Sequence, residues 1–182
     1  MRSYHDDEWG HPAADEARIY ENLCLEGFQA GLSWLTVLRK REGFRAAFSN
    51  FDPEKVARYT DAHVERLLAD TRIIRNRAKI NATVTNARAT LALRETGTSL
   101  AVVVWQHRPA REHAPGAFPD LPATTPESDA LSKELRRRGF AFLGPTTVYA
   151  SMQSLGVVND HLRHCHWRAV VETERARFVV PA

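Results

Sequence analysis

Helix-boundary residues recur along this 182-residue chain and constrain its fold more than any other feature. Asp52-Pro53-Glu54 and Thr125-Pro126-Glu127 each combine an N-cap side chain, a proline at the first helical position and an acid in the first turn. Arg136-Arg137-Arg138-Gly139 places basic residues and a glycine where a helix ends. These patterns predict helix starts near residues 53 and 126 and an all-α chain.

Apolar residues at helical spacing extend this prediction along most of the sequence. Between Asp15 and Phe48 they indicate helix, with a break from Gly27 to Ser33. Further helices are expected over residues 61–69, 77–93, 99–106 and 145–155. The periodicity of residues 102–105 also permits a strand, but no segment with an alternating pattern is present to pair with it. Residues 107–127, rich in proline, form the one long loop, and we predict a single domain over residues 1–182.

Composition limits the classes of protein to which the chain can belong. At 43% hydrophobic residues the chain can bury a substantial core. The longest apolar run, residues 100–105, is far too short to span a membrane. Two cysteines and an N-terminus unlike a signal peptide favour a reducing compartment, and we expect a cytoplasmic protein.

Charge is distributed unevenly along the sequence. Residues 1–26 hold seven acids and two arginines, a net charge of −5, which leaves +8 on the remainder of a chain whose total is +3. Basic side chains gather at residues 39–45, 72–79 and 133–138, and such clusters can form a surface for nucleic-acid phosphates. Each cluster can equally be a solvated helix face, and we favour that interpretation for residues 133–138.

The second basic cluster lies where two predicted helices meet. A short turn that opens a helix presents free backbone N–H groups to an anion, and neighbouring cations add charge. We therefore predict a DNA-phosphate site here, although an ordinary helix–helix turn with exposed charges explains the same pattern. The candidate side chains are Arg72, Arg75, Arg77 and Lys79.

A possible metal site lies near the C-terminus. His161 and Cys165 are four residues apart, so on a helix they would face the same way and could bind one Zn²⁺, with His5 as a third ligand. Such spacing also arises by chance, and a lone histidine is more often a hydrogen-bonded polar residue.

One acid, Glu26, stands within an apolar run, where a charge is costly without a partner. Tyr4, Trp9 and Trp34 belong to the same two N-terminal strings as this acid and its apolar run. Aromatic rings near one carboxylate could sandwich a planar ligand, while the acid accepts hydrogen bonds from its N–H groups. Each aromatic alone is more readily explained as core, but their joint occurrence with Glu26 favours a ligand site.

Six strings in order carry a resemblance to a known family. The chain resembles the bacterial DNA-3-methyladenine glycosylase I family from Tyr4 to about Cys165. The strings are Tyr-His-Asp-Asp-Glu-Trp-Gly at 4–10, Cys-Leu-Glu-Gly-Phe-Gln-Ala-Gly-Leu-Ser-Trp at 24–34, Phe-Asp-Pro-Glu-Lys-Val at 51–56, Ile-Ile-Arg-Asn-Arg-Ala-Lys-Ile at 73–80, Ser-Asp-Ala-Leu-Ser-Lys at 128–133 and Val-Asn-Asp-His at 158–161.

The resemblance implies a helix-hairpin-helix DNA glycosylase, with this motif over about residues 61–94. Such an enzyme flips 3-methyladenine out of alkylated double-stranded DNA and hydrolyses its N-glycosidic bond, leaving an abasic site. By the same likeness Glu26 hydrogen-bonds the base, Tyr4 and Trp34 stack on it, Trp9 walls the pocket, and Leu32 fills the gap left in the stack. We expect a monomer.

The expected catalytic role of Glu26 is electrostatic. Many helix-hairpin-helix glycosylases place a catalytic Asp about one helix after the hairpin, whereas residues 81–100 contain only Glu95 as an acid. Methylation at N3 already makes the base cationic and its glycosidic bond labile. Glu26 would then hold the base and favour attack by water rather than act as a nucleophile, and no lysine is an obvious Schiff-base former.

The resemblance also implies that the N-terminal segment 1–10 and residues 158–168 converge in a lobe built around zinc. In the family an N-terminal Cys, the His of Tyr-His-Asp, and the His and Cys following Val-Asn-Asp hold the metal. His5, His161 and Cys165 match three of these ligands, and the first Cys has no counterpart after Met1. We expect an upstream start, a fourth ligand from water, His164 or His166, or loss of zinc.

Two other interpretations compete with an active glycosylase. One is a damaged-DNA-binding protein with the same fold but little or no excision. The other, a helix-turn-helix regulator, requires a recognition helix that reads bases, and no segment fits that description. In addition, Thr71-Arg72 stands where family members often have a glycine, which changes the backbone freedom of the hairpin.

Overall fold

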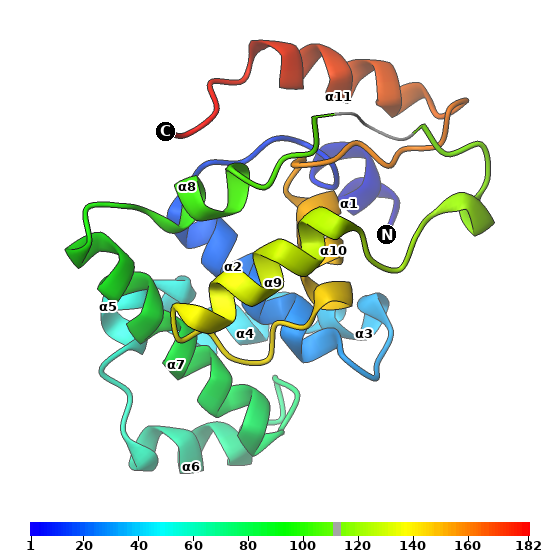
Figure 1. Ribbon diagram of the computed structural model, residues 1–182. Coiled ribbons are helices and arrows are strands. Elements are labelled where there is room, and N and C mark those ends of the chain that lie inside the picture. Colours follow the sequence, from blue (N-terminus) through cyan, green and yellow to red (C-terminus); the bar gives the residue numbers. More distant parts are fainter. Residues whose placement is uncertain (111–113) are drawn as a thin grey trace.

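The computed structural model describes residues 1–110 and 114–182, and every regular element in this part of the chain is helical (Figure 1). The all-α prediction is therefore confirmed. Among the described residues, no helix is both long and apolar enough to cross a lipid bilayer. The elements are α1 (Arg2–Asp7), α2 (Glu16–Gln29), α3 (Trp34–Arg39), α4 (Arg41–Ala47), η1 (Ser49–Phe51), α5 (Pro53–Val56), α6 (Asp61–Ala69), α7 (Arg77–Glu95), α8 (Leu100–Trp105), η2 (Phe118–Asp120), α9 (Pro126–Arg137), α10 (Pro145–Ser154) and α11 (His166–Arg177), where η denotes a 3₁₀ turn.

The helix starts expected from capping residues are found in the structure. The Asp52 side chain accepts from the first backbone N–H groups of α5, and the Thr125 side chain does the same for α9. Residues 102–105 are helical rather than extended, and Ser99 caps this helix, α8. The predicted break from Gly27 to Ser33 is narrower than expected, because α2 continues to Gln29.

Two helices, α1 and α11, have no counterpart among the predictions. Neither has a side-chain cap hydrogen bond at its N-terminus, so the boundary signals that reveal α5 and α9 are missing. Both helices lie near the same end of the molecule, with α11 across the top and α1 beneath it (Figure 1). Their stability therefore depends on tertiary contacts rather than on local sequence.

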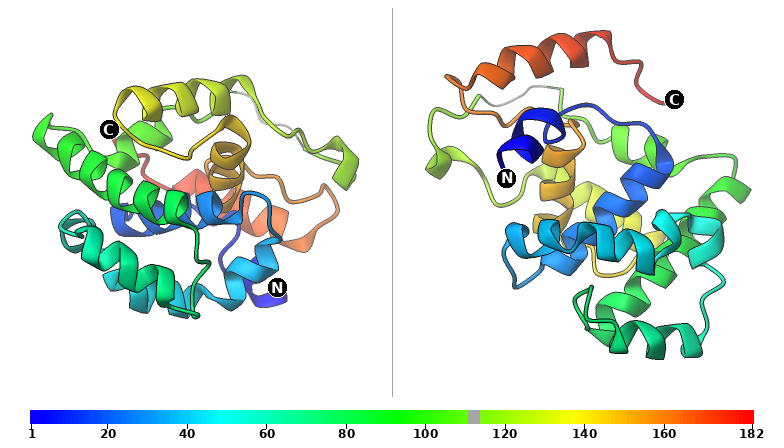
Figure 2. Two further views of the ribbon diagram at one scale, coloured as in Figure 1. Left: turned by 90° about the horizontal axis from the view of Figure 1, so that it is seen from below. Right: turned by 180° about the vertical axis from the view of Figure 1, so that it is seen from behind.

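Helix α2 forms the centre of the fold. It packs against α3, α7, α8 and α10, and the two views of Figure 2 show these helices around it. Asp15 caps its start, and the residues from Leu23 to Phe28 are all buried. This surrounding packing encloses Glu26, which projects from the middle of that buried stretch.

The N-terminal segment joins α10 through its backbone. The N–H of Gly10 donates to the Ser154 carbonyl at 3.3 Å, and the N–H of Ala13 donates to the Leu155 carbonyl at 3.2 Å. Gly10 has φ +86°, and a Cβ there would lie 2.9 Å from Nε2 of His161. A glycine is therefore required where the N-terminal chain approaches the histidine.

Helices α6 and α7 lie at the end of the molecule opposite α11 (Figures 1 and 2). Residues 70–76 connect them, and the Asn76 side chain caps α7. Gly43 of α4 allows close approach to this connection, since a Cβ there would lie 2.6 Å from the Arg72 carbonyl oxygen. The two helices occupy the range in which the helix-hairpin-helix motif is expected.

Candidate active site

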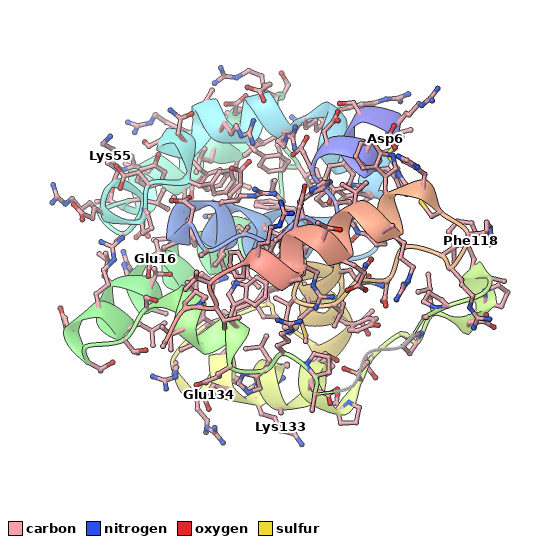
Figure 3. All side chains as sticks on the ribbon, turned by 90° about the horizontal axis from the view of Figure 1, so that it is seen from above. Asp6, Glu16, Lys55, Phe118, Lys133 and Glu134 are labelled. Carbon is pink, nitrogen blue, oxygen red and sulfur yellow. The ribbon has the colours of Figure 1, made fainter. Side chains whose placement is uncertain are left out.

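A cavity of about 400 Å³ opens between α1, α2, α3 and α10. Trp9, residues 160–162, 164 and 165, and Phe118 and Leu121 at η2 complete its lining, and Phe118 projects at the edge of the molecule (Figure 3). The volume lies in the range of small-molecule sites. It brings together residues from both ends of the chain.

Glu26 lines this cavity as a buried acid without a protein partner. Its residue surface is only 5% exposed, and no hydrogen bond or ion pair reaches its carboxyl group from the described residues. Burial raises its pKa to about 8. Both carboxyl oxygens of Glu26 keep some solvent-accessible surface, because neither belongs to the fully buried polar atoms without a hydrogen-bond partner. Both oxygens are therefore accessible from the cavity. The site therefore offers an acceptor that only a ligand or water can satisfy.

Tyr4 and Trp34 form one aromatic wall beside this acid. Their ring centroids are 5.3 Å apart and their planes are inclined by 46°. A planar ligand between two rings needs about 7 Å, twice a carbon–carbon contact, so the predicted sandwich is wrong for this pair. A base can stack on the wall they form, and their contact with a base stays a prediction.

A hydrogen bond with Ser154, which Asn22 also contacts, fixes the position of the Tyr4 hydroxyl group. It lies 2.9 Å from Oγ of Ser154, to which Nδ2 of Asn22 also donates at 2.9 Å. Burial raises the pKa of Tyr4, so the phenol stays protonated. The ring orientation is consequently set before a ligand enters.

Trp9 lines the cavity beside the two histidines His5 and His161, which also line it. Its ring stacks on His5 at 5.9 Å and 17°, and it meets His161 edge-on at 4.7 Å. It lines the cavity, as expected from the resemblance. The same side chain therefore borders both the ligand cavity and the candidate metal site.

His5, His161 and Cys165 form the candidate metal site. Their ligand atoms lie within 4.8 Å of one another, and the described residues contain no other ligand at this cluster. Sγ of Cys165 is 3.9 Å from Nε2 of His5 and 3.7 Å from Nδ1 of His161. The expected substitutes His164 and His166 are not part of the cluster.

The route by which His161 and Cys165 meet differs from the prediction. Residues 159–165 are not helical, so the four-residue spacing does not act through a helix face. A turn closed by the Cys165 N–H and the Leu162 carbonyl, 2.8 Å apart, brings them together instead. The expectation of a shared helix face is therefore wrong, although the proximity itself is present.

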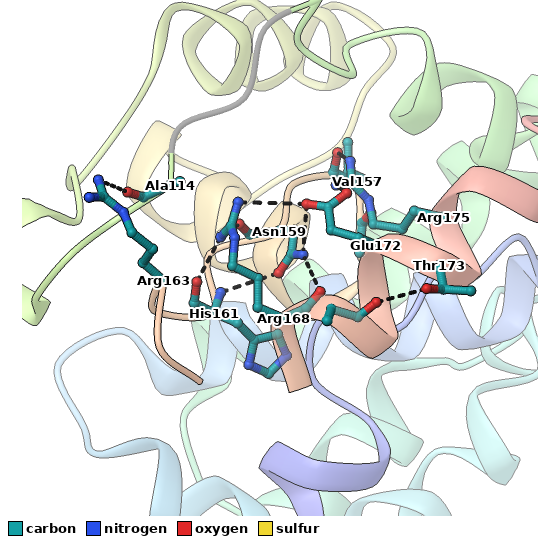
Figure 4. Close-up of polar contacts among 11 residues, drawn as sticks. Ala114, Val157, Asn159, His161, Arg163, Arg168, Glu172, Thr173 and Arg175 are labelled. Carbon is teal, nitrogen blue, oxygen red and sulfur yellow. Dashed lines mark hydrogen bonds and ion pairs between the residues drawn. The ribbon is translucent and has the colours of Figure 1, made fainter. Parts of the chain in front are cut away.

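Helix α11 clamps the segment that carries His161 (Figure 4). Arg168 donates through Nη1 to the Asn159 carbonyl at 2.9 Å and to the His161 carbonyl at 2.7 Å. Arg175, 2% exposed, donates to the carbonyls of residues 156 and 157 at 2.8 and 2.9 Å. These contacts hold one wall of the cavity from outside.

Of the arginines predicted to contact DNA, Arg75 is the most available. Arg72 pairs with Asp70 at 2.7 Å, and Arg77 pairs with Glu65 at 2.7 Å. Arg75 is exposed and has no ion-pair partner among the described residues. All three lie on or beside the connection between α6 and α7, and their contact with DNA stays a prediction.

Lys79 does not lie where a DNA phosphate could reach it. The side chain is buried, and Nζ donates to the carbonyls of Phe28 at 2.8 Å and Ala30 at 2.6 Å. Burial lowers the pKa of its ammonium group. The predicted phosphate contact is therefore wrong for Lys79, because its charge is used to hold the C-terminus of α2.

Leu32 stands at the tip between α2 and α3. The residue is 43% exposed, and Gly31 before it has φ +79°. Ser33 after it caps α3. The arrangement presents an apolar side chain on a defined turn, and insertion into a base stack stays a prediction.

Sequence reasoning missed several cavity residues. Gln153 of α10 and Phe118 and Leu121 near η2 carry no motif that would distinguish them. Asp160 also lines the cavity, and its position within the Val-Asn-Asp-His string was the available signal.

Known proteins are similar to this chain in sequence and in fold. A family model described as methyladenine glycosylase matches residues 1–169. The chain belongs to this family. A DNA-3-methyladenine glycosylase 1 from Escherichia coli is 49% identical over 166 residues, covering 90% of this chain and 88% of the relative. A DNA-3-methyladenine glycosylase from Haemophilus influenzae is 47% identical over 165 residues, covering 89% of each chain.

Solved structures of methyladenine glycosylases have the same fold. A structure of 3-methyladenine DNA glycosylase I from Staphylococcus aureus, which concerns 3-methyladenine recognition, superposes with a TM-score of 0.88. It is 34% identical and covers 92% of this chain and 90% of its own. The family membership therefore rests on sequence and on fold together.

Proposed function

We propose that this protein is a DNA glycosylase that excises 3-methyladenine from alkylated double-stranded DNA by hydrolysing the N-glycosidic bond, leaving an abasic site. The observation that carries the proposal is Glu26, a buried acid without a partner beside an aromatic wall. The named activity of the relatives agrees with it. We further propose that the enzyme acts as a cytoplasmic monomer and has no lyase step.

The chemistry follows from the charge of the damaged base. A base methylated at N3 is cationic while attached to the sugar and leaves as a neutral molecule. Glu26 accepts hydrogen bonds from the base and offsets its charge, which favours the flipped state over the stacked one. The aromatic wall adds stacking, and water attacks the sugar as the bond to the base breaks.

Release of free 3-methyladenine from methylated duplex DNA tests this function. The purified protein is expected to release the base well above spontaneous loss, with abasic sites in equal number. DNA binding without release would instead support the damage-binding alternative.

The pH dependence of excision follows from the raised pKa of Glu26. The carboxylate form increases as pH rises through about 8, so kcat/KM should increase between about pH 6 and pH 9, approaching tenfold per unit at the acidic end. Single-turnover release across overlapping buffers measures this. A profile that falls over this range, or the same rise in Glu26→Gln, would contradict the assignment.

We propose zinc at the His5, His161 and Cys165 cluster. The other ring nitrogens of both histidines are engaged: Nδ1 of His5 lies 2.8 Å from Asp6, and Nε2 of His161 lies 3.2 Å from the Trp9 carbonyl. This leaves the facing nitrogens free as ligands. Tetrahedral zinc places nitrogen and sulfur ligands roughly 3.6 Å apart, close to the spacing present here. When bound, zinc would crosslink the N-terminal segment to residues 161–165.

Zinc binding is expected to appear as metal content and stability rather than as chemistry. Elemental analysis should find about one zinc per chain, and chelation should lower the melting temperature. His161→Ala should abolish both the bound zinc and the effect of chelator. A folded parent protein without metal after growth in zinc would contradict the proposal.

A further inference from the structure

Asp160 is a second acid in the cavity, and the chemistry above does not use it. The residue is 4% exposed. Its Oδ2 accepts from the Tyr149 hydroxyl at 2.6 Å and from Nε2 of Gln153 at 2.7 Å. Oδ1 has no hydrogen-bond partner among the described residues. It keeps some solvent-accessible surface, because it does not belong to the fully buried polar atoms without a partner. Since Asp160 lines the cavity, we infer that this free oxygen opens into it.

The two acids occupy different walls. Glu26 projects from the middle of α2, whereas Asp160 belongs to the segment between α10 and α11 that Arg168 and Asn159 hold in place. Burial alone accounts for the raised pKa of Glu26, with no contribution from the charge of Asp160. A ligand that fills the cavity can therefore meet each acid at a different edge.

We propose that Asp160 is a second recognition group, whose Oδ1 accepts a hydrogen bond from an N–H group of the flipped base at an edge that Glu26 does not contact. The inference rests on the proposed glycosylase function. A buried acceptor without a hydrogen bond costs free energy, so a donor from the ligand that forms this bond contributes strongly to binding. Two donors on Oδ2 fix the direction of Oδ1 before the ligand arrives.

Asp160→Asn isolates the oxygen that faces the cavity. Tyr149 and Gln153 both donate, so the new amide oxygen must occupy the Oδ2 position and the amide nitrogen must face the cavity. The network is then retained while the acceptor becomes a donor. Tyr149→Phe is the matched control, because it removes a donor from Oδ2 and leaves the acid in place.

The experiment measures the Kd for free 3-methyladenine by calorimetry, together with melting temperature, zinc content and base release from methylated duplex DNA. We expect Asp160→Asn to bind about 10- to 100-fold more weakly at parental zinc content. Tyr149→Phe should lower the melting temperature but lose less than about threefold in affinity. Asp160→Glu, which restores an acid, should recover part of the loss.

Each outcome decides a separate question. Parental affinity in Asp160→Asn, or an equal loss in Tyr149→Phe, would overturn the recognition role and leave a structural network. A parent protein that neither binds nor releases 3-methyladenine would refute the proposed function itself. If Asp160→Asn does not fold, the assigned carboxyl ¹³C resonance of Asp160 in the parent should shift when 3-methyladenine is added, and an unchanged resonance would overturn the inference.

Discussion

Replacing Glu26 with Gln is expected to lower kcat/KM for 3-methyladenine release by about 10²- to 10³-fold. Glutamine matches the size of the side chain but removes the negative charge that opposes the cationic base. The amide nitrogen of glutamine also replaces one acceptor oxygen with an N–H donor, which cannot accept a hydrogen bond from the N–H groups of the base. Single-turnover release from methylated duplex DNA measures the loss.

Stability separates this loss from unfolding. Burial raises the pKa of Glu26 above its ordinary value, so the folded state loses stability as pH rises toward about 8, and Glu26→Gln should melt no lower than the parent. Glu21→Gln is the matched control, because Glu21 lies on the same helix, outside the cavity, paired with Arg45 at 2.7 Å. Its kcat/KM should stay within about threefold of the parent, and an equal loss in both variants would remove the special role of Glu26.

Replacing Lys79 with Met is expected to destabilise the protein by about 3 kcal/mol. The change leaves the carbonyls of Phe28 and Ala30 without their charged donor at the end of α2. The melting temperature should fall by roughly 10 °C for a chain of this size. Differential scanning calorimetry and urea unfolding measure the effect.

Arg75→Met is the control that distinguishes a structural role from a DNA contact. Arg75 is exposed, so its loss should change the free energy of unfolding by no more than about 0.5 kcal/mol. It should weaken binding to undamaged duplex DNA and reduce the salt dependence by about one ion. If Lys79→Met kept the parental stability but bound DNA more weakly, Lys79 would be a DNA-phosphate contact after all, contrary to its burial in the structure.

Much of the fold was predictable because its signals are local. Asp52 and Thr125 are N-cap residues, which mark helix starts through hydrogen bonds that span only a few residues. Both caps are present in the structure. Helix α11 has no such cap, and its Arg175 is satisfied by carbonyls of residues 156 and 157, far outside the reach of local patterns. Elements stabilised in this way are not visible in the periodicity of the chain.

The candidate site divides in the same manner. The strings around Tyr4 and Glu26 indicated a ligand site, but Tyr4 and Trp34 proved to be one wall rather than two faces of a sandwich. Lys79 and Arg75 look alike as basic residues four positions apart. Packing against α2 buries only Lys79, and although Lys79 falls within the predicted helix over 77–93, nothing in that pattern indicates that its ammonium group is used by the end of another helix.

The sequence by itself determined the helical class, the starts of the capped helices α5 and α9, and the motifs that mark the methyladenine glycosylase family. Capping, periodicity and motif spacing act over a few residues, so these features can be read in order along the chain. Only the tertiary structure decided which acids are buried, which cations are free and that Asp160 faces the cavity with Glu26. The burial of a side chain and its hydrogen-bond or ion-pair partners depend on segments distant in sequence. The free energies of these interactions therefore arise only when those segments pack together.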